Sequence, residues 1–327
     1  MSEILIIGAG MAGLTCATRL AAAGRDVLVI DKGRGPGGRM AARRAEVAGE
    51  TLGFDHGAQY FTARHPDFLA QVREWEAQGV VAKWPAAGED AWVGTPGMNA
   101  PIRAMADKVA VNWSVRAESP DQGAINAVNR NWIVEVNGGE WKFHPHTVLL
   151  TVPAEQALDL LSGLERNMPD CPKRRLAEIP AKVRSEPCWA VMAAFAQPLN
   201  IEADCLRDAE APISWAARNS AKPQRNGAET WVLHASPAKS REIINMPKEE
   251  AAEHLLAEFF AQTGLAPVSP IHLTAHRWLY AMPEKVGGEP AYFDSAARIG
   301  IAGDYLHSPR VEGAFLSGLA LAERVLT

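Results

Sequence analysis

Two short apolar runs, separated by a glycine-rich turn and a helical segment, open the chain. The first run, Ile4–Ile7, is wholly apolar, as expected for a strand that is buried on both faces of a parallel sheet. Leu14–Ala23 then predicts a helix that ends at Gly24, and Val27–Ile30 forms a second apolar run closed by Asp31. The pattern indicates a right-handed βαβ unit with short connections.

Helical and strand-like patterns alternate up to about residue 153. Asp67–Gln78 is amphipathic and predicts a helix that carries Phe68, Val72 and Trp75 on one face. The other segments are a helix at Pro96–Val109, strands at Ala110–Ala117, Asn131–Val136, from Trp141 and at Thr147–Val152, and a turn at Asn137-Gly138-Gly139.

Alternation with a period of two marks the middle of the chain. It occurs in Cys188–Phe195, Thr230–Ser236 and Ile271–Tyr280, which predicts a mainly antiparallel sheet. Met246–Gly264 has the start and stop signals of a helix.

The last stretch returns to the pattern of the opening unit, with a strand end at Ile299–Asp304 and a helix rich in small residues at Glu312–Leu326. We therefore expect an α/β protein with a Rossmann-type nucleotide-binding domain and a second, mainly antiparallel α+β domain for the substrate. The nucleotide-binding domain is expected to comprise residues 1–64, 96–153 and 295–327, and the substrate domain residues 65–95 and 154–294.

Composition restricts the class of protein. With 47% hydrophobic and 22% charged residues the chain is typical of a globular protein, and its net charge of -5 argues against a large nucleic-acid surface. We find no secretory signal and no run near the roughly 20 apolar residues of a membrane span, so we expect a cytoplasmic protein without a membrane partner. The cysteines form no CxxC pair or zinc pattern, so we expect no metal and read them as buried thiols: Cys16, Cys171, Cys188 and Cys205.

The turn after the first strand has the spacing of a dinucleotide-binding motif. Gly8, Gly10 and Gly13, with Ala12 between the last two, form GxGxxG between a strand and a helix, and Asp31 follows 18 residues after the last glycine. Gly8 allows the tight turn, Gly10 the approach of a pyrophosphate, and Gly13 close packing of the helix on the strand. The bare helix N-terminus then binds the phosphates, and Asp31 accepts hydrogen bonds from the ribose.

An acid at position 31 argues for a free ribose 2′-hydroxyl but leaves NAD and FAD open as cofactors. The segment from Asp31 to Met40 resembles the extended fingerprint of glutathione-reductase-type flavoproteins of the amine-oxidase branch. The resemblance implies that FAD is the cofactor, with Arg34 and Arg39 donating to its pyrophosphate; a solvated basic loop is the alternative. The residues that it adds to the cofactor site are Lys32, Arg34, Gly38, Arg39 and Met40.

A second segment, near the C-terminus, resembles the other flavin motif of the same family. It implies that Asp304, after Gly303, binds the ribityl chain or the pyrophosphate, and that the amides of Gly313 and Ala314 face N1 and O2 of the flavin. A helix N-terminus at that place stabilises the negative charge of a reduced flavin. Val311 and Glu312 complete this part of the expected site.

Three further segments, Phe54–Ala63, Trp92–Met98 and His276–Ala281, resemble renalase, in particular its bacterial members. The resemblance implies oxidation of dihydronicotinamide dinucleotides reduced at ring position 2 or 6 to NAD(P)+, with O2 as the electron acceptor and H2O2 as the product. It also implies further cofactor contacts from His56, Gly57, Ala58, Gln59 and Val115.

Arg310 distinguishes the chain from the amine-oxidising relatives, which have an aromatic cage residue two places before Glu-Gly-Ala. A guanidinium repels an ammonium substrate and pairs with a carboxamide or a phosphate. No cysteine lies near Asp304 or Arg310, so we expect the FAD to be non-covalent. Period two places His276, Trp278 and Tyr280 on one face of their strand, where they could stack on a planar ring, although core packing is an equal alternative.

These residues predict an FAD-dependent oxidoreductase in which Arg310, His276, Trp278 and Tyr280 contact the substrate and a hydride passes to flavin N5. Trp189, Trp215, Asn219 and Trp231 are weaker pocket candidates. The alternatives are a flavin-containing amine oxidase, a desaturase-type oxidoreductase and a flavin-binding protein without turnover. The preference between NAD and NADP forms, the physiological electron acceptor and the oligomeric state remain open.

Overall fold

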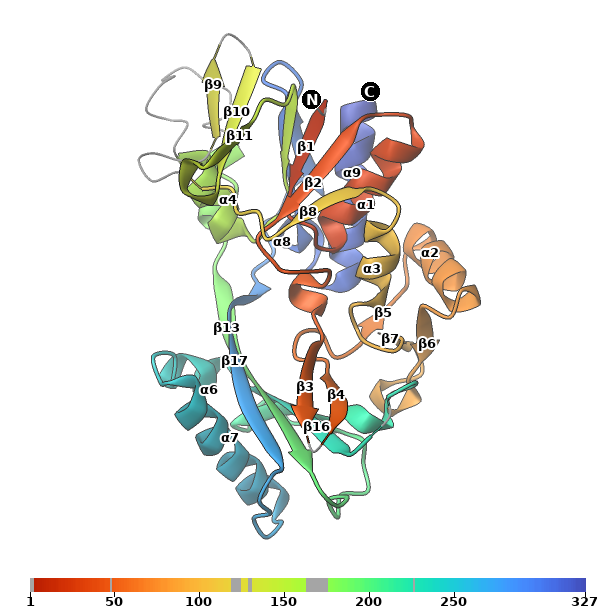
Figure 1. Cartoon of the computed structure of the whole chain (residues 1–327), viewed down its shortest axis with the longest axis vertical. Coiled ribbons are helices and arrows are strands. Elements are labelled where there is room, and N and C mark those ends of the chain that lie inside the picture. Colours follow the sequence, from red (N-terminus) through yellow and green to blue (C-terminus); the bar gives the residue numbers. More distant parts are fainter. Residues whose placement is uncertain (1–2, 48, 119–124, 129–130, 163–175, 226) are drawn as a thin grey trace. The chain divides into compact units, whose positions relative to one another are not determined.

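Two sheets of different construction organise the chain, which the computed structural model describes over residues 3–47, 49–118, 125–128, 131–162, 176–225 and 227–327 (Figure 1). The chain divides into two compact units, each assembled from segments far apart in the sequence. The first unit comprises Met1–Gly38, Ile102–Arg184 and Pro283–Thr327, and the second comprises Arg39–Pro101 and Ser185–Met282.

The first unit contains a six-stranded sheet. In spatial order its strands are β18 (Ala291–Asp294), β19 (Ile299–Ala302), β12 (Thr147–Leu150), β1 (Ile4–Ile7), β2 (Val27–Asp31) and β8 (Ala110–Trp113). Neighbouring strands from β19 to β8 are parallel, and β18 pairs antiparallel at one edge. The strands β1, β12 and β19 are buried along their whole length, which explains their nearly continuous apolar sequences. The predicted Rossmann-type sheet is confirmed.

Two helices of the first unit, α1 (Met11–Ala22) and α9 (Val311–Leu326), pack directly against each other. Gly318 permits the close approach, because a Cβ at this position would lie 2.1 Å from the carbonyl oxygen of Ala12. The small residues of the last helix therefore serve helix packing. The unit also contains α4 (Ala154–Ser162) and α8 (Asp304–His307).

A small antiparallel sheet completes the first unit. Its strands are β9 (Ile125–Val128), β10 (Asn131–Val136) and β11 (Trp141–Phe143). Trp132 and Val134 of β10 lie in one buried cluster with Val115, Leu150 and Leu161. The predicted turn at Asn137–Gly139 connects β10 to β11.

The second unit contains a five-stranded sheet. In spatial order its strands are β14 (Cys205–Arg207), β15 (Ile213–Arg218), β16 (Glu229–Ala235), β13 (Ser185–Phe195) and β17 (His272–Pro283). The pairs from β14 to β13 are antiparallel, as the period-two pattern predicts. This confirms a mainly antiparallel second sheet.

Both faces of this sheet are covered within the second unit. The covering elements are α6 (Pro237–Glu242), α7 (Lys248–Thr263), β3 (Arg43–Val47) and β4 (Glu50–Phe54). Trp189 and Phe195 of β13 pack with Phe259 of α7, whereas Met192 and Ala194 of the same strand pack with the β3–β4 hairpin. Successive side chains of β13 therefore enter two different cores.

The rest of the second unit is built around a three-stranded sheet and two helices. The strands are β5 (Phe61–Thr62), β6 (Val81–Lys83) and β7 (Ala91–Gly94), and the helices are α2 (Pro66–Ala77) and α3 (Ala100–Ala106), the last of which contains a unit boundary. Residues Phe68, Val72 and Trp75 of α2 are buried as predicted. The helix predicted at Pro96–Val109 is wrong in extent, because the amide of Met98 donates to the Asp55 carboxylate instead of to a helical carbonyl.

The two units differ from the predicted domains in four segments, two of which are short: residues 96–101 lie in the second unit and residues 283–294 in the first. Residues 39–64 lie in the second unit, because the β3–β4 hairpin packs on β13 and β16. Residues 154–184 belong to the first unit, where Leu161 of α4 joins the core beside Leu150.

Cys16 and Cys188 are buried as predicted, and burial raises the pKa of Cys188 to about 12. Cys205 is only half-buried, because it lies on the edge strand β14, and Cys171 lies outside the described residues.

Among the described residues, no helix is both long and apolar enough to span a membrane.

Candidate functional site

The glycine turn between β1 and α1 has a backbone that only glycine accommodates. Gly8 has φ 110° and donates its amide to the Ile30 carbonyl at 2.8 Å. A Cβ on Gly13 would lie 1.9 Å from the Gly8 carbonyl oxygen, so α1 can approach β1 closely only because residue 13 is glycine. Thr151, just after β12, donates its hydroxyl to the same Gly8 oxygen at 2.8 Å. The turn is thus held by β2 through the Ile30 carbonyl, by α1 through the close approach of Gly13, and by the Thr151 hydroxyl.

Gly10 differs from these two glycines, because the space beside it is open. It has φ -83° and ψ -173°, and a Cβ built there would meet no atom within 4 Å. The Cα of Gly10 is instead approached by Gly38, whose own Cβ would lie 3.5 Å away. No side chain of the described residues caps the α1 N-terminus at Gly10. A pyrophosphate therefore fits here, with open space and free helix amides on the same side.

Asp31 is held in a defined orientation at the end of β2. Its carboxylate accepts from the amide of Ala9 at 2.7 Å and from that of Gly33 at 2.6 Å, and its carbonyl accepts from Val115 at 2.9 Å. A carboxylate has about four acceptor positions, so two remain for the hydroxyls of a ribose. The Val115 side chain is buried in the core and contributes through its backbone.

The C-terminal motif forms a second site in the first unit. The amide of Gly303 donates to Ser317 at 2.8 Å, and Asp304 is buried with 5% exposure. Helix α9 begins directly after Arg310, whose carbonyl accepts from Ala314, and no side chain of the described residues caps it. A Cβ on Gly313 would lie 2.1 Å from the Ser308 carbonyl oxygen, so this turn also requires glycine. Uncapped amides at a helix start suit a ring that gains negative charge on reduction.

The other expected cofactor residues are divided between the two units. In the first unit Lys32 and Arg34 are exposed, and Lys32 donates to Gln156 at 3.0 Å. In the second unit the carbonyl of Arg39 accepts from Ala58 at 2.8 Å, and Met40 is buried. The remaining expected residues are Ala12, Gly38, Val311 and Glu312 in the first unit and His56, Gly57 and Gln59 in the second.

The segment from His56 to Gln59 is tightly anchored within the second unit. A Cβ on Gly57 would lie 2.1 Å from the Arg39 carbonyl oxygen, so the two backbones meet there. The side-chain amide of Gln59 donates to the carbonyls of Asp55 and Gly57, which fixes the turn from inside. The Gln59 side chain is thus one of the contacts that hold the backbone of this segment.

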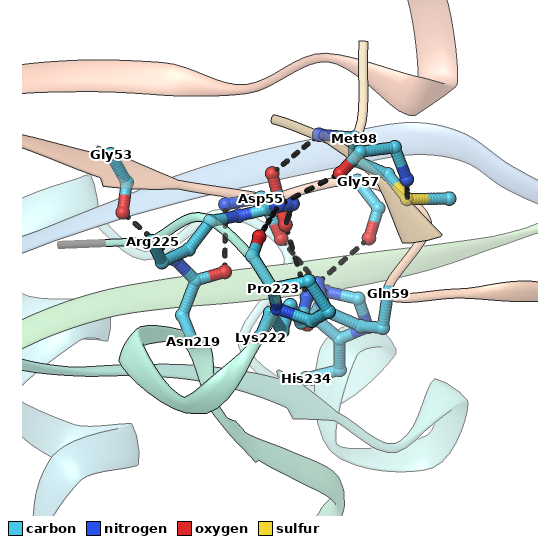
Figure 2. A network of polar contacts seen from close by, with 11 residues as sticks. Gly53, Asp55, Gly57, Gln59, Met98, Asn219, Lys222, Pro223, Arg225 and His234 are labelled. Carbon is cyan, nitrogen blue, oxygen red and sulfur yellow. Dashed lines mark hydrogen bonds and ion pairs between the residues drawn. The ribbon is translucent and has the colours of Figure 1, made fainter. Parts of the chain in front are cut away.

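A buried ionic network lies beneath that segment (Figure 2). Asp55 is 2% exposed at its side chain, and its carboxylate accepts from Met98 at 2.8 Å, Lys222 at 3.2 Å and Arg225 at 2.6 Å. Lys222, with a fully buried side chain, also donates to Gln59 at 3.1 Å. One carboxylate thus faces two cations, which leaves excess positive charge in the interior.

Burial controls ionisation in this network. The pKa of Lys222 is lowered to about 8, because burial, together with the charge of Arg225, outweighs the opposing effect of Asp55. Burial alone would raise the pKa of Asp55, but the charges of Lys222 and Arg225 outweigh it and lower that pKa. Burial, and then the charge of Lys222, lower the pKa of His234 to about 4. His234 is therefore neutral near pH 7.

A cluster of three aromatic side chains adjoins the same segment. The His56 ring stacks on Trp278 at 5.2 Å and meets His276 edge-on at 5.0 Å, and the Trp278 indole donates to the His56 carbonyl at 2.8 Å. Burial lowers the pKa of His56 to about 3 and that of His276 to about 4, and Arg43 of β3 lowers both. Both rings are neutral and lie in the field of a cation.

The predicted substrate residues lie on β17 of the second unit and at the start of α9 in the first. His276, Trp278 and Tyr280 are half-buried while Arg277 and Leu279 between them are exposed, as the alternation predicts. Arg310 is exposed and belongs to the first unit.

The four weaker pocket candidates lie in different surroundings within the second unit. Trp189 and Trp231 lie in the core between the five-stranded sheet and α7. Trp215 is half-buried and stacks on Tyr60, and Asn219 is buried, where it bonds to Gly53 and Asp55.

The charged residues of the second unit that surround the His56–Gln59 segment were not among the residues predicted from the sequence. Asp55 stands inside the Phe54–Ala63 segment, where a buried acid next to a glycine turn could have been suspected. Lys222 and Arg225 lie in a polar stretch without periodicity, and nothing in the sequence connects them to a residue more than 160 positions away. Arg43 is one of several arginines in its segment of the sequence, and only its position in the structure, where its charge acts on His56 and His276, distinguishes it from the others.

Comparison with known proteins is consistent with this geometry. A family model described as flavin containing amine oxidoreductase matches residues 85–326, and one described as a NAD(P)-binding Rossmann-like domain matches residues 6–75. A hydroxyneurosporene desaturase from Rubrivivax gelatinosus is 46% identical over 62 residues, a match that spans 19% of this chain and only 11% of that protein.

Solved structures share the fold over the whole chain. A candidate protoporphyrinogen oxidase from Exiguobacterium sp. 255-15 has a TM-score of 0.71 at 12% identity, covering 99% of this chain and 98% of that one. Putrescine oxidase bound to putrescine has a TM-score of 0.66 at 15% identity, covering 99% of both chains. Cyclohexylamine oxidase from Brevibacterium oxydans IH-35A has a TM-score of 0.61 at 14% identity, covering 100% of both chains.

The family model spans most of the chain, and both flavin motifs have backbones that suit the cofactor. The chain therefore belongs to the flavin containing amine oxidoreductases and is an FAD-dependent oxidoreductase that binds its cofactor non-covalently.

Proposed function

We propose that the protein oxidises dihydronicotinamide dinucleotides reduced at ring position 2 or 6 to NAD(P)+, with O2 as the final electron acceptor. The observation that carries this proposal is the charge around the aromatic cluster of His56, His276 and Trp278. The charge of Arg43 lowers the pKa of both histidines, and burial keeps them neutral. A neutral, aromatic surface beside a cation favours a planar uncharged ring attached to an anionic group.

In the proposed reaction, the substrate loses a hydride from the reduced ring carbon and leaves as the aromatic pyridinium. When bound, FAD would supply a two-electron acceptor for this hydride, and return of both electrons to O2, with the hydride-derived proton and one proton from solvent, would give H2O2. The protein needs no general acid or base for hydride transfer. Trp278 and His276 are proposed to orient the dihydropyridine, and the neutral imidazole of His276 can bond to its carboxamide.

The alternative is amine oxidation, which the family description and the amine substrates of the structural neighbours favour. Arg43 and Arg310 argue against it. Two like unit charges 4 Å apart repel by about 4 kcal/mol at an effective dielectric constant of 20, which lowers the affinity for an ammonium about a thousandfold. An ammonium bound at that distance from either guanidinium would therefore be disfavoured, whereas the phosphates of a dinucleotide would be attracted.

Anaerobic stopped-flow reduction of the bound flavin tests the proposal. The wild-type flavin should bleach rapidly with 2- or 6-dihydro-NAD and stay oxidised with putrescine and cyclohexylamine. Arg310→Met and Arg43→Met should slow the dinucleotide reaction, whereas Arg103→Met, at an exposed position on α3, provides the matched control. Fast bleaching by either amine would overturn the proposal in favour of amine oxidation. Bleaching by a carotenoid precursor alone would favour a desaturase.

A further inference from the structure

A second aromatic cluster in the second unit takes no part in the proposed hydride transfer. Tyr60 and Trp215 stack with ring centroids 5.3 Å apart and planes 23° from parallel. The guanidinium carbon of Arg207 lies 4.6 Å from the centre of the Trp215 ring and 5.1 Å from that of Tyr60. Both rings are half-buried and Arg207 is exposed, so the cluster opens to solvent.

Arg207 differs from the neighbouring Arg218 in its ionic partners among the described residues. Its guanidinium donates to the Ala87 carbonyl, and within the described ranges no carboxylate forms an ion pair with it. The neighbouring Arg218, by contrast, pairs with both Asp204 and Glu229. A guanidinium held against two rings and left without a carboxylate is suited to a phosphate, which it can bind through two parallel hydrogen bonds.

The position of this cluster connects it to the His56–His276–Trp278 cluster. Trp215 of β15 stands opposite His234 of β16, and Gln59 contacts His234 at 3.4 Å. The chain from His56 to Tyr60 therefore crosses the sheet, touching β17 at its start, β16 at Gln59 and β15 at its end.

The spacing of the two clusters follows from the strand order. The order β15-β16-β13-β17 places three strand spacings between them, which is about 14 Å measured across the strands. An extended dinucleotide can cross several strands of a sheet, since its two rings are joined through two riboses and a pyrophosphate. One substrate molecule could therefore reach both clusters.

We propose that Tyr60, Trp215 and Arg207 form a subsite for the adenosine diphosphate half of the substrate. This inference rests on the proposed dinucleotide oxidation and extends it from the reacting ring to the far end of the molecule. The adenine stacks on the aromatic pair and Arg207 binds a phosphate. Stacking on an aromatic side chain tolerates any base, so the subsite selects a nucleotide without reading its edge.

The subsite acts on substrate binding and lies away from the reacting carbon. Its contribution therefore belongs to KM, and it can be measured by comparing a dinucleotide with the corresponding mononucleotide, which lacks the adenosine half. Wild-type holoenzyme should show a KM for 6-dihydro-NAD about ten- to a hundredfold below that for 6-dihydronicotinamide mononucleotide. Trp215→Leu and Arg207→Met should each raise the dinucleotide KM toward the mononucleotide value.

Controls separate binding from folding. Trp215→Phe keeps an aromatic face and should recover most of the KM difference, whereas Arg241→Met removes an exposed arginine elsewhere in the unit and should leave the difference intact. FAD content and Tm identify variants that fail to fold. A KM ratio that is unchanged in folded Trp215→Leu and Arg207→Met, or a wild type with equal KM values, overturns the subsite.

A second measurement keeps the subsite testable if the proposed reaction fails. Equilibrium dialysis of ADP against FAD-loaded protein should show saturable binding that Trp215→Leu and Arg207→Met weaken at least tenfold. If neither dihydronicotinamide bleaches the flavin but ADP binds in this way, the reaction is wrong and the nucleotide subsite stands. If ADP does not bind to the wild type, or binds equally to both variants, the subsite is wrong.

Discussion

Asp55→Asn removes the one negative charge of the buried network in the second unit. The substitution keeps the size of the side chain and one acceptor for Met98, but it leaves Lys222 and Arg225 without a counter-ion at 0% and 5% side-chain exposure. Removing one partner of a buried ion pair costs about 3–5 kcal/mol, because the remaining charge stays desolvated and unpaired. Against a total stability of about 5–15 kcal/mol this is a large loss.

Urea denaturation of the FAD-loaded protein, followed by tryptophan fluorescence and flavin release, measures the effect. Asp55→Asn should lower the transition midpoint strongly, and Asp55→Asn combined with Lys222→Met should recover part of the loss, because the double variant leaves one cation unpaired instead of two. Asp90→Asn is the matched control, since Asp90 pairs with Arg64 on the surface. If Asp55→Asn and Asp90→Asn shift the midpoint equally, the network does not stabilise the unit and the reasoning fails.

Two other predictions follow from the glycine turn and from the ionisation of the network. Gly10→Val should give folded protein without FAD, because the backbone without cofactor tolerates a Cβ there, whereas Gly13→Val should fail to fold because its Cβ would clash with the Gly8 carbonyl oxygen. Circular dichroism measures folding and the A450/A280 ratio measures FAD content. A Gly10→Val protein with full FAD content would refute the placement of the pyrophosphate. Lys222 has a folded pKa of about 8 against an ordinary 10.5, so the unfolded chain binds more protons between these values and the free energy of unfolding should rise over pH 8–10.5. Lys222→Met should lack that rise in matched denaturation curves, and equal pH profiles would contradict the assignment.

Local pattern was sufficient for most elements of both units. The strands β1 and β2, the helix α7 with its stop at Gly264, and the alternation in β13 all follow from side-chain periodicity and from residues with restricted backbones. The helix expected at Pro96–Val109 was too long, and its shorter extent could not be predicted from side-chain periodicity. A carboxylate 43 residues away takes the Met98 amide.

The residues of the candidate site also fall into two groups, those that local sequence pattern predicts and those that only the fold brings together. Sequence alone determined the glycine turn, its distance to Asp31 and the start of the last helix, because each is a backbone requirement within a few residues of the motif. The tertiary structure alone decided that Asp55 faces Lys222 and Arg225, and that His56 meets Trp278 across 222 positions. Such pairs depend on the order of the strands and on which hairpin covers which face of the sheet. The residues next to a charged side chain in the sequence do not show whether that side chain will be buried against a partner or exposed to solvent.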